Sequence, residues 1–417
     1  MTFLIVDQPI NNRGDESAHR AFVNRLSMAY PEAKIQVLFF EKLPIEVDEM
    51  RVVRPNVEYI NIPTRHRLFA PHRMIKLWMM LGLPFMLYTL PLVKKMLRLY
   101  RQADYIIGSP GGIDLGGFQN WIHLGLFHLA RNEGKKILYF ARSIGPFPTT
   151  TRLNRRFKKQ SIDLLRYFSF LSLRDVKSQI LAQELNIPFV PTIDSAFLHY
   201  ESEPVPDSFN EKMGKNEYLV LVPNSLAWHH NFKQYTFDEI RSFWVKLVNR
   251  LLAEYPDLKI AMLPQTVHHG FFASLPDGYK FFCRIREESD NPERIVVLEE
   301  QYGSNIQQNI ISKAKFLIGA RYHSVIFSIN QNCPFISLCY EHKMKGVTDM
   351  LGLEDIDILE LFDGTPLDEA RVDKFVNRIV DMTYRITSDA KNGERANAIA
   401  NEGFVALTSF LDKDMKH

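Results

Sequence analysis

Short runs of apolar residues alternate with segments of helical periodicity along the whole chain. In the first half, Glu16–Ala29 and Val176–Leu185 have the 3.6-residue spacing of helices, and in the second half Phe237–Glu254 and Ser304–Ala314 have it. Strands that alternate with helices in this way are typical of a parallel α/β architecture. The predicted strands are Phe3–Val6, Ile35–Phe39, Tyr105–Ile107, Lys136–Phe140, Phe170–Leu173, Phe189–Thr192, Tyr218–Val222, Lys259–Met262, Ile295–Val297, Phe316–Gly319 and Phe335–Leu338.

The alternation is interrupted once, by a polar stretch without periodicity at residues 201–217. This stretch holds two prolines and is predicted to be an interdomain linker. We therefore expect an α/β fold with two Rossmann-like domains, residues 1–200 and 218–385, that face each other across a cleft in a glycosyltransferase-B-like arrangement. The end of the chain, from Val372 to Leu411, has helical periodicity with a predicted break at Asn392-Gly393, and residues 386–417 are expected to form a helical tail.

The densest apolar run of the chain is Leu77–Val93, which has 17 uncharged residues. As one helix it would reach only about 25 Å, less than the ~30 Å core of a bilayer. Pro84 and Pro91 would also interrupt such a helix, so a membrane-spanning segment is not expected. Two interpretations stay open for the segment 73–101: a buried helix with solvated ends, or peripheral contact with an anionic membrane. The second is suggested by the flanking cations Arg65, Arg67, Arg73, Lys76, Lys94, Lys95, Arg98 and Arg101.

Composition narrows the class of protein. The 417 residues are 46% hydrophobic and 24% charged, as in globular proteins, and the net charge of +3 gives no indication of a nucleic-acid partner. Three cysteines without a Cys-x-x-Cys pair exclude a disulfide framework and a cysteine-based zinc site. No His-Glu-x-x-His motif is present, and the adjacent pairs His229-His230 and His268-His269 are poorly spaced for one ion, so no metal is expected. The first residues lack a basic region before the apolar run, which favours a cytoplasmic protein.

Polar motifs follow several predicted strands, where open α/β sheets bind ligands. After the first strand come Asn12, Gly14, Asp15 and Glu16, in which Asp15 could cap a helix or present a carboxylate to the cleft. After the third comes a glycine-rich loop, Gly108–Gly112, where Gly111 and Gly112 let the backbone approach a ligand. This loop lacks the Gly-Lys-Ser/Thr of a nucleotide-binding P-loop.

Cationic residues follow other predicted strands. Arg142 begins the motif Arg-Ser-Ile-Gly-Pro-Phe, and Arg174 lies in Leu-Arg-Asp just before a helix. The densest motif is Gly319-Ala-Arg-Tyr-His-Ser, in which Arg321 and His323 combine a forked anion binder with an imidazole. Lys343 follows about twenty residues later in Tyr-Glu-His-Lys-Met-Lys-Gly. Together these groups predict an anion-binding and proton-transfer site.

Taken together, the set of motifs resembles the polysaccharide pyruvyl transferase family, from Asn12 to about Leu353. The pieces that carry the resemblance are Asn-x-Gly-Asp-Glu, the glycine-rich loop, Ser-Ile-Gly-Pro-Phe, Leu-Arg-Asp, Asp194-Ser195-Ala196-Phe197, Pro264-Gln265-Thr266, Gly-x-Arg-x-His and Tyr-x-x-Lys-x-x-Gly. Two positions depart from the family pattern. Arg142 stands where Gln is usual, which leaves its role open, and Ser195 stands where Pro is usual.

The resemblance implies a glycosyltransferase-B-like fold and the transfer of the enolpyruvyl skeleton of phosphoenolpyruvate to a sugar as a cyclic ketal. Such a reaction needs cations for the carboxylate and phosphate, an acid for the methylene carbon and a base for the sugar hydroxyl. We expect His323 to be the acid and Asp15 the base, with Glu16 and Glu341 as alternatives for the base. The cations are expected to be Arg174, Arg321, Lys343 and Arg142, and the acceptor loops to include Asn12, Glu16, Gly111, Gly112 and Gln265.

The expected partners are phosphoenolpyruvate and a galactose-like sugar of a surface-polysaccharide precursor, either soluble or carried by a polyprenyl lipid at the inner face of the cytoplasmic membrane. No cofactor is expected. Trp228, Trp244 and Tyr322 are candidates either for stacking on a sugar or for the core. Two other functions stay open: a nucleotide-sugar glycosyltransferase of the same fold, and a non-catalytic saccharide-binding scaffold protein.

Overall fold

The computed structural model describes residues 1–8, 12–39, 51–62, 71–198, 201–226, 229, 232–266, 278–299 and 302–416. The chain divides into two compact units. The first contains almost all residues up to 200 together with Asn397–His417, and the second runs from Glu201 to Ala396 and includes the short piece around Arg13 and Gly14. Six residues considered in the sequence analysis lie outside the described residues: Arg65, Arg67, Trp228, His230, His268 and His269.

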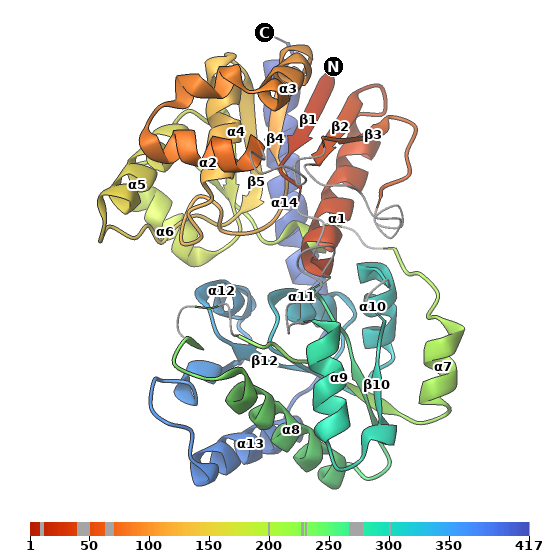
Figure 1. The fold of residues 1–417 in the computed structure, drawn as a ribbon. Coiled ribbons are helices and arrows are strands. Elements are labelled where there is room, and N and C mark those ends of the chain that lie inside the picture. Colours follow the sequence, from red (N-terminus) through yellow and green to blue (C-terminus); the bar gives the residue numbers. More distant parts are fainter. Residues whose placement is uncertain are drawn as a thin grey trace. The chain divides into compact units, whose positions relative to one another are not determined.

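The first unit is built on a parallel sheet with the strand order β3-β2-β1-β4-β5-β6-β7 (Figure 1). Its strands are β1 (Thr2–Val6), β2 (Lys34–Phe39), β3 (Val57–Asn61), β4 (Tyr105–Gly108), β5 (Lys136–Arg142), β6 (Phe170–Leu173) and β7 (Val190–Pro191). Its helices are α1 (Arg13–Ala29), α2 (Pro71–Leu81), the 3₁₀ turn η2 (Pro84–Thr89), α3 (Pro91–Gln102), α4 (Trp121–Asn132), α5 (Arg152–Leu165), α6 (Val176–Glu184), η3 (Ser195–Phe197) and most of α14 (Ala390–Asp414).

Helices cover both faces of this sheet, because alternate strand residues point to opposite sides. Leu4 and Val6 belong to a core that also includes buried residues of α2, α3, α4 and α5. On the opposite face, Phe22 of α1 stacks on Phe140 of β5, and Phe404 of α14 meets both rings edge-on. The last helix of the chain therefore completes the core of the first unit, and Figure 1 shows α14 in blue beside the red and orange strands.

The second unit repeats the design with the strand order β10-β9-β8-β11-β12-β13, again parallel. Its strands are β8 (Tyr218–Val222), β9 (Lys259–Met262), β10 (Ile295–Val297), β11 (Leu317–Gly319), β12 (Phe335–Cys339) and β13 (Ile356–Asp357). Its helices are α7 (Asp207–Met213), α8 (Phe237–Glu254), α9 (Tyr279–Glu288), η6 (Pro292–Arg294), α10 (Ser304–Ser312), α11 (Tyr322–Asn330), α12 (His342–Leu351), η7 (Ile358–Glu360) and α13 (Glu369–Thr383).

Local sequence explains where several helices begin. The side chains of Asn120, Thr151 and Asp175 accept backbone N–H bonds at the starts of α4, α5 and α6. Thr236 and Glu239 form a capping box at the start of α8. Each cap satisfies N–H groups that have no partner inside the helix, so these positions fix the boundaries.

Each predicted strand is present with its ends shifted by at most two residues, and the α/β fold class is confirmed. The strands β3 and β13 were not predicted. In the expected linker 201–217, residues Asp207–Met213 form α7. The predicted break at Asn392-Gly393 is wrong, because both residues lie inside α14 and the chain leaves helical geometry earlier, between α13 and α14. A Cβ on Gly393 would lie 2.9 Å from the carbonyl oxygen of Ile329, so this glycine allows close packing.

The apolar run Leu77–Val93 is divided as its prolines predict. α2 ends at Leu81, Pro84 starts η2 and Pro91 starts α3. Within the described residues, no helix combines the length and the apolar character that crossing a bilayer requires.

Candidate active site

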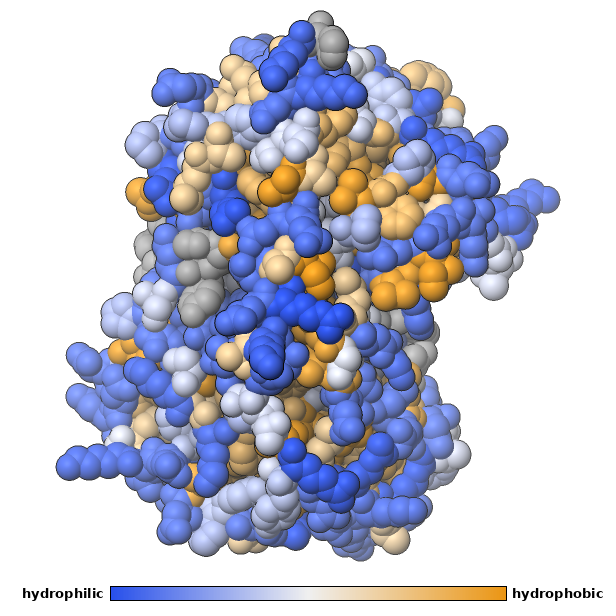
Figure 2. All heavy atoms as spheres, turned by 180° about the vertical axis from the view of Figure 1, so that it is seen from behind, coloured by the Kyte–Doolittle hydropathy of each residue, from blue (hydrophilic) through white to orange (hydrophobic). Residues whose placement is uncertain are grey.

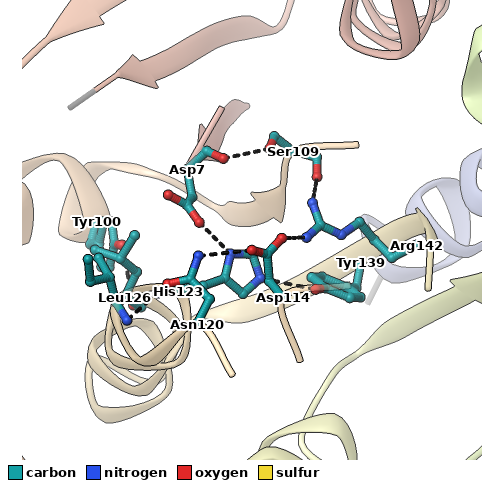
Figure 3. A network of polar contacts seen from close by, with 10 residues as sticks. Asp7, Tyr100, Ser109, Asp114, Asn120, His123, Leu126, Tyr139 and Arg142 are labelled. Atoms are coloured by element: carbon teal, nitrogen blue, oxygen red, sulfur yellow. Dashed lines mark hydrogen bonds and ion pairs between the residues drawn. The ribbon is translucent and has the colours of Figure 1, made fainter. Parts of the chain in front are cut away.

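A buried polar network lies at the carboxyl ends of β1, β4 and β5 in the first unit (Figure 3). The neighbouring strands β1 and β4 are followed by helices that lead away in opposite directions along the sheet order, which is where open α/β sheets place ligands. His123 of α4 is fully buried, with Nδ1 2.5 Å from Asp7 Oδ2 and Nε2 3.0 Å from the hydroxyl of Tyr139. Because a carboxylate can only accept, Nδ1 of His123 donates to Asp7.

Arg142 enters the same network from the end of β5. A register irregularity between Tyr139 and Arg142, with Ala141 at φ 49°, brings the guanidinium over the ring of Tyr139, 4.9 Å from its centroid. The guanidinium donates to the carbonyl of Ser109 and to Asp114. Burial alone would raise the pKa of Asp114, but His123 and Arg142 together lower it to about 2. Arg142 thus serves the internal structure of the first unit, and its role toward phosphoenolpyruvate stays a prediction.

Three groups of this network, Asp7, Asp114 and His123, present ligand atoms within 4.8 Å of one another, the spacing of a metal site. Each already has protein partners, since Asp7 binds His123 and Asp114 accepts from Asn120 and Arg142. A guanidinium bound to one of the carboxylates would also repel a cation. The arrangement therefore supports an ion-pair network more directly than a metal site.

Asp15 and the glycine-rich loop meet in the first unit. A Cβ placed on Gly111 would lie 3.2 Å from Asp15 Oδ1 and 3.5 Å from Arg142 Nη1, and Gly111 has a φ of 146°. Both features favour glycine at this position. A Cβ on Gly112 would make only ordinary contacts, the nearest with Phe118. Glu16, the next residue of α1, is buried.

Arg174 is also held inside the first unit. Its Nε donates to Ser143 Oγ over 3.0 Å, and its Nη1 pairs with Asp194, which is fully buried. Leu-Arg-Asp and the Asp194 motif, far apart in the sequence, are therefore linked by one ion pair. Ser195 donates its hydroxyl to the carbonyl of Ala18, a bond that a proline at this position could not make.

His323 lies at the carboxyl edge of the second unit, near the start of α11 and directly after β11. A Cβ on Gly14 would lie 1.8 Å from its Nδ1, so the backbone of Gly14 packs directly on the imidazole. The Asn12 side chain accepts from the N–H of Gly14 over 2.8 Å, and the N–H of Arg13 donates to the carbonyl of Gln265 over 2.8 Å. The structure therefore brings together three residues that were predicted from separate motifs: Asn12, Gln265 and His323.

Two cations accompany His323 at this edge. Arg321 is the N-cap residue of α11, and Lys343 lies in the first turn of α12, which follows the neighbouring strand β12. Lys343 Nζ is 3.0 Å from Glu341 Oε1 and 5.8 Å from the ring centroid of Tyr322. Burial would raise the pKa of Glu341, but the attraction and hydrogen bond of Lys343 more than offset this and lower it. Glu341 is thus held ionised as the partner of Lys343.

Several groups at this edge were not predicted from the sequence. The Tyr340 ring meets His229 edge-on with centroids 5.5 Å apart, and burial together with Glu341 raises the pKa of Tyr340. Asn224, after β8, donates to the carbonyl of Ala320. Their position after strands β8 and β12 was the available signal. Trp244 is buried and donates to the carbonyl of Asn224, so it belongs to the core.

The family model for polysaccharide pyruvyl transferase matches residues 47–342, well over half of the chain. The chain belongs to the polysaccharide pyruvyl transferase family. It is 22% identical over 277 residues to the amylovoran biosynthesis protein AmsJ of Erwinia amylovora, and the match spans 64% of each protein.

Solved structures agree with the fold. A putative UDP-N-acetylglucosamine 2-epimerase from Listeria monocytogenes matches with a TM-score of 0.60 at 8% identity, over 99% of this chain and 96% of that one. The UDP-GlcNAc 2-epimerase from Neisseria meningitidis matches with a TM-score of 0.57 at 10% identity, over 99% and 100%. These matches extend through both units and confirm the glycosyltransferase-B-like fold; at such low identity they carry no information on the substrate.

Proposed function

We propose that the protein transfers the enolpyruvyl skeleton of phosphoenolpyruvate to two hydroxyls of a sugar in a surface-polysaccharide precursor, and so forms a cyclic pyruvate ketal. Membership of the family supports the transferase class. The relative AmsJ is an amylovoran biosynthesis protein, which supports an exopolysaccharide as the destination of the product. A galactose-like hexose is the proposed acceptor.

The observation that carries the proposal is the group of residues around the start of α11. Arg321 is at the N-cap position of this helix, His323 lies in its first turn, and Lys343 lies in the first turn of the next helix along the sheet. Helix N-termini present N–H groups and a partial positive charge, which favour phosphate and carboxylate groups. Arg321 and Lys343 are therefore the proposed ligands of phosphoenolpyruvate in the second unit.

His323 is the proposed acid. In the reaction, a proton is added to the methylene carbon of phosphoenolpyruvate, C2 becomes cation-like, and a sugar hydroxyl bonds to it. The bond from C2 to the phosphate oxygen then breaks, and the second hydroxyl bonds to C2. Of the two hydroxyl protons, one replaces the proton that the acid gave to carbon and the other leaves with phosphate. An imidazole beside a dianion favours the protonated form that the first step needs.

Asp15 is the proposed base for a sugar hydroxyl. It follows Gly14 directly in the Asn-x-Gly-Asp-Glu motif. The carboxylate itself lies against Gly111, in the loop proposed to approach the acceptor.

The test is incubation of the protein with phosphoenolpyruvate and soluble or lipid-linked galactosides, followed by assays of phosphate release and of a pyruvate-sized mass gain on the sugar. His323→Ala should lower kcat by about 10²–10⁴-fold with an unchanged melting temperature. His128→Ala, a half-buried histidine of α4, is the matched control and should keep its activity. Full activity of His323→Ala would remove the assigned acid.

A binding measurement separates this proposal from a nucleotide-sugar transferase. Phosphoenolpyruvate at one hundred times its Kd should stabilise the protein by about 2.7 kcal/mol, whereas nucleotide sugars should not raise the melting temperature. Stabilisation by a nucleotide sugar alone would favour the glycosyltransferase instead. Binding of a saccharide without any turnover would favour a scaffold protein.

A further inference from the structure

The outer surface of α2, η2 and α3 in the first unit exposes large apolar side chains. Leu77 and Leu81 are four residues apart on α2 and so lie on one face, 43% and 51% exposed. Leu83 and Phe85 follow directly and are 36% and 64% exposed. The opposite sides of the same elements are core, with Ile75, Met79 and Leu87 almost fully buried. The apolar run is therefore half core and half surface.

A second element, distant in the sequence, extends this surface with positive charge. Helix α5 contacts α2, and Arg156 donates to the carbonyl of Met80 over 2.6 Å while its guanidinium lies against Gly82. Leu153 of α5 is 40% exposed. Figure 2 shows hydrophobic residues at the surface of the first unit, interspersed with hydrophilic ones.

The charged side chains of these segments are all positive, apart from histidine. Residues 71–102 contain six Lys and Arg and residues 148–162 contain five, and neither segment contains an Asp or Glu. Since the whole chain has a net charge of only +3, the rest of it is net negative. Arg101 pairs with Glu133, but Arg73, Lys76, Lys94, Lys95 and Arg98 of α2 and α3 are exposed, as are Arg152, Arg155, Arg156 and Lys159 of α5.

We propose that this surface, formed by α2, η2, α3 and the start of α5, binds the face of an anionic lipid bilayer, with Leu81, Leu83 and Phe85 inserted among the acyl chains. Exposed Leu and Phe on the same elements as exposed Lys and Arg match an interface in which the headgroups are negative and the region beneath them is apolar. Neither charge nor apolar area alone gives firm attachment, whereas this surface combines both. The inference is independent of the reaction proposed above.

Sedimentation with vesicles tests it on the full chain without any substrate. The protein should bind vesicles that contain phosphatidylglycerol and not vesicles of phosphatidylcholine alone, and 0.5 M salt should weaken the binding. Lys94→Glu/Lys95→Glu should lower the partition coefficient by about tenfold or more, while Lys413→Glu/Lys416→Glu, with the same change in net charge, should not.

A second pair of variants tests the apolar side chains of this surface. Phe85→Asp should reduce binding, whereas Val405→Asp, at a 57% exposed position of α14, should leave it unchanged. Melting temperatures and turnover of a soluble acceptor should be unchanged in all four variants, which separates loss of binding from unfolding and from failure of the proposed reaction. Unaltered binding of Phe85→Asp would overturn insertion. A soluble polyanion can also be added as a competitor. If it displaced Phe85→Asp and the wild type from vesicles to the same extent, the surface would instead bind acidic polymers.

Discussion

Glycines at two positions of this protein are fixed by side chains that come from distant parts of the sequence. Gly14 is needed because the ring of His323 occupies the space of a Cβ, and Gly111 because Asp15 and Arg142 lie beside it. From the sequence, each glycine was read as a turn residue or as part of a ligand loop. The partner side chain could be identified only once the topology had brought the segments together.

Gly14→Ala should therefore damage the site without a large loss of stability. The added methyl would lie 1.8 Å from Nδ1, so the imidazole must move. Displacement of an acid by about 1 Å can cost on the order of 10²-fold in rate, and we expect a loss of kcat of this size. Gly117→Ala is the control, because a Cβ there would meet nothing within 4 Å. Equal activity of both variants would show that His323 does not need its present position.

The charges of the first unit also predict a pH dependence. The pKa of Asp114 is lowered to about 2 in the folded protein, so its contribution to stability is complete above the ordinary value of 3.8 and is lost as the pH falls through 2. The difference in free energy of unfolding between the wild type and Asp114→Asn should shrink by about 2 kcal/mol between pH 5 and pH 2. Urea titrations at these pH values measure it, and a constant difference would mean that Arg142 and His123 do not hold this carboxylate.

At the scale of elements, the sequence was most informative for buried strands and least informative for marginal ones. β8 is a continuous apolar run and β9 is apolar after Lys259, as in sheets covered on both faces, and the ends of both strands were predicted correctly. β3 is an edge strand with partly exposed residues and β13 has two residues, so neither has a clear pattern. Gly393 was interpreted as a helix break, although its lack of a side chain serves packing against α11.

The candidate site was predicted in part for a similar reason. Strand-end positions identified Arg321, His323 and Lys343, because the carboxyl edge of a parallel sheet follows from the strand pattern. The same rule selected Arg142 and Arg174 but could not show that Asp114 and Asp194 bind them, since the pairing depends on tertiary packing. His123, in the first turn of α4, follows no predicted strand directly and was not identified from the sequence.

Helix α14 makes a specific prediction about stability. Leu407 is fully buried in the core of the first unit, so Leu407→Ala should lower the free energy of unfolding by about 2–5 kcal/mol. Val405, two residues away, is 57% exposed, and Val405→Ala should change it by less than about 0.5 kcal/mol. Denaturant unfolding monitored by circular dichroism compares the two. Similar effects would mean that α14 is not packed on this core.

At the scale of the whole molecule, the chain does not divide into two halves at the end of the first sheet. Phe404 packs on Phe22 and Phe140, and Asp414 accepts from Tyr105 and pairs with Lys136, so the first unit needs the last helix. The second unit in turn includes Arg13, which is fully buried and bonded to Gln265. Each unit therefore contains a piece from the other end of the sequence.

Fragments should reveal this exchange. A fragment of residues 1–200 expressed alone should be insoluble or molten, because the apolar face beneath α14 is uncovered. Co-expression with residues 201–417 should restore a soluble complex that purifies together. The matched control is residues 1–200 with residues 201–396, which lack the part of α14 in the first unit. Recovery of a folded 1–200 fragment without its partner would contradict the required role of α14.

The position of α14 in the sequence also determines when, during synthesis, the first unit can finish folding. The strands of the first unit leave the ribosome first, yet their covering helix is translated about 200 residues later, roughly 10–40 s at ordinary elongation rates. During that interval the face that contains Phe22 and Phe140 has no permanent cover, and the second unit is made in the meantime. The first unit is thus completed only after the second unit has been translated, and a product that ends before α14 would carry an exposed apolar face that chaperones and proteases can recognise.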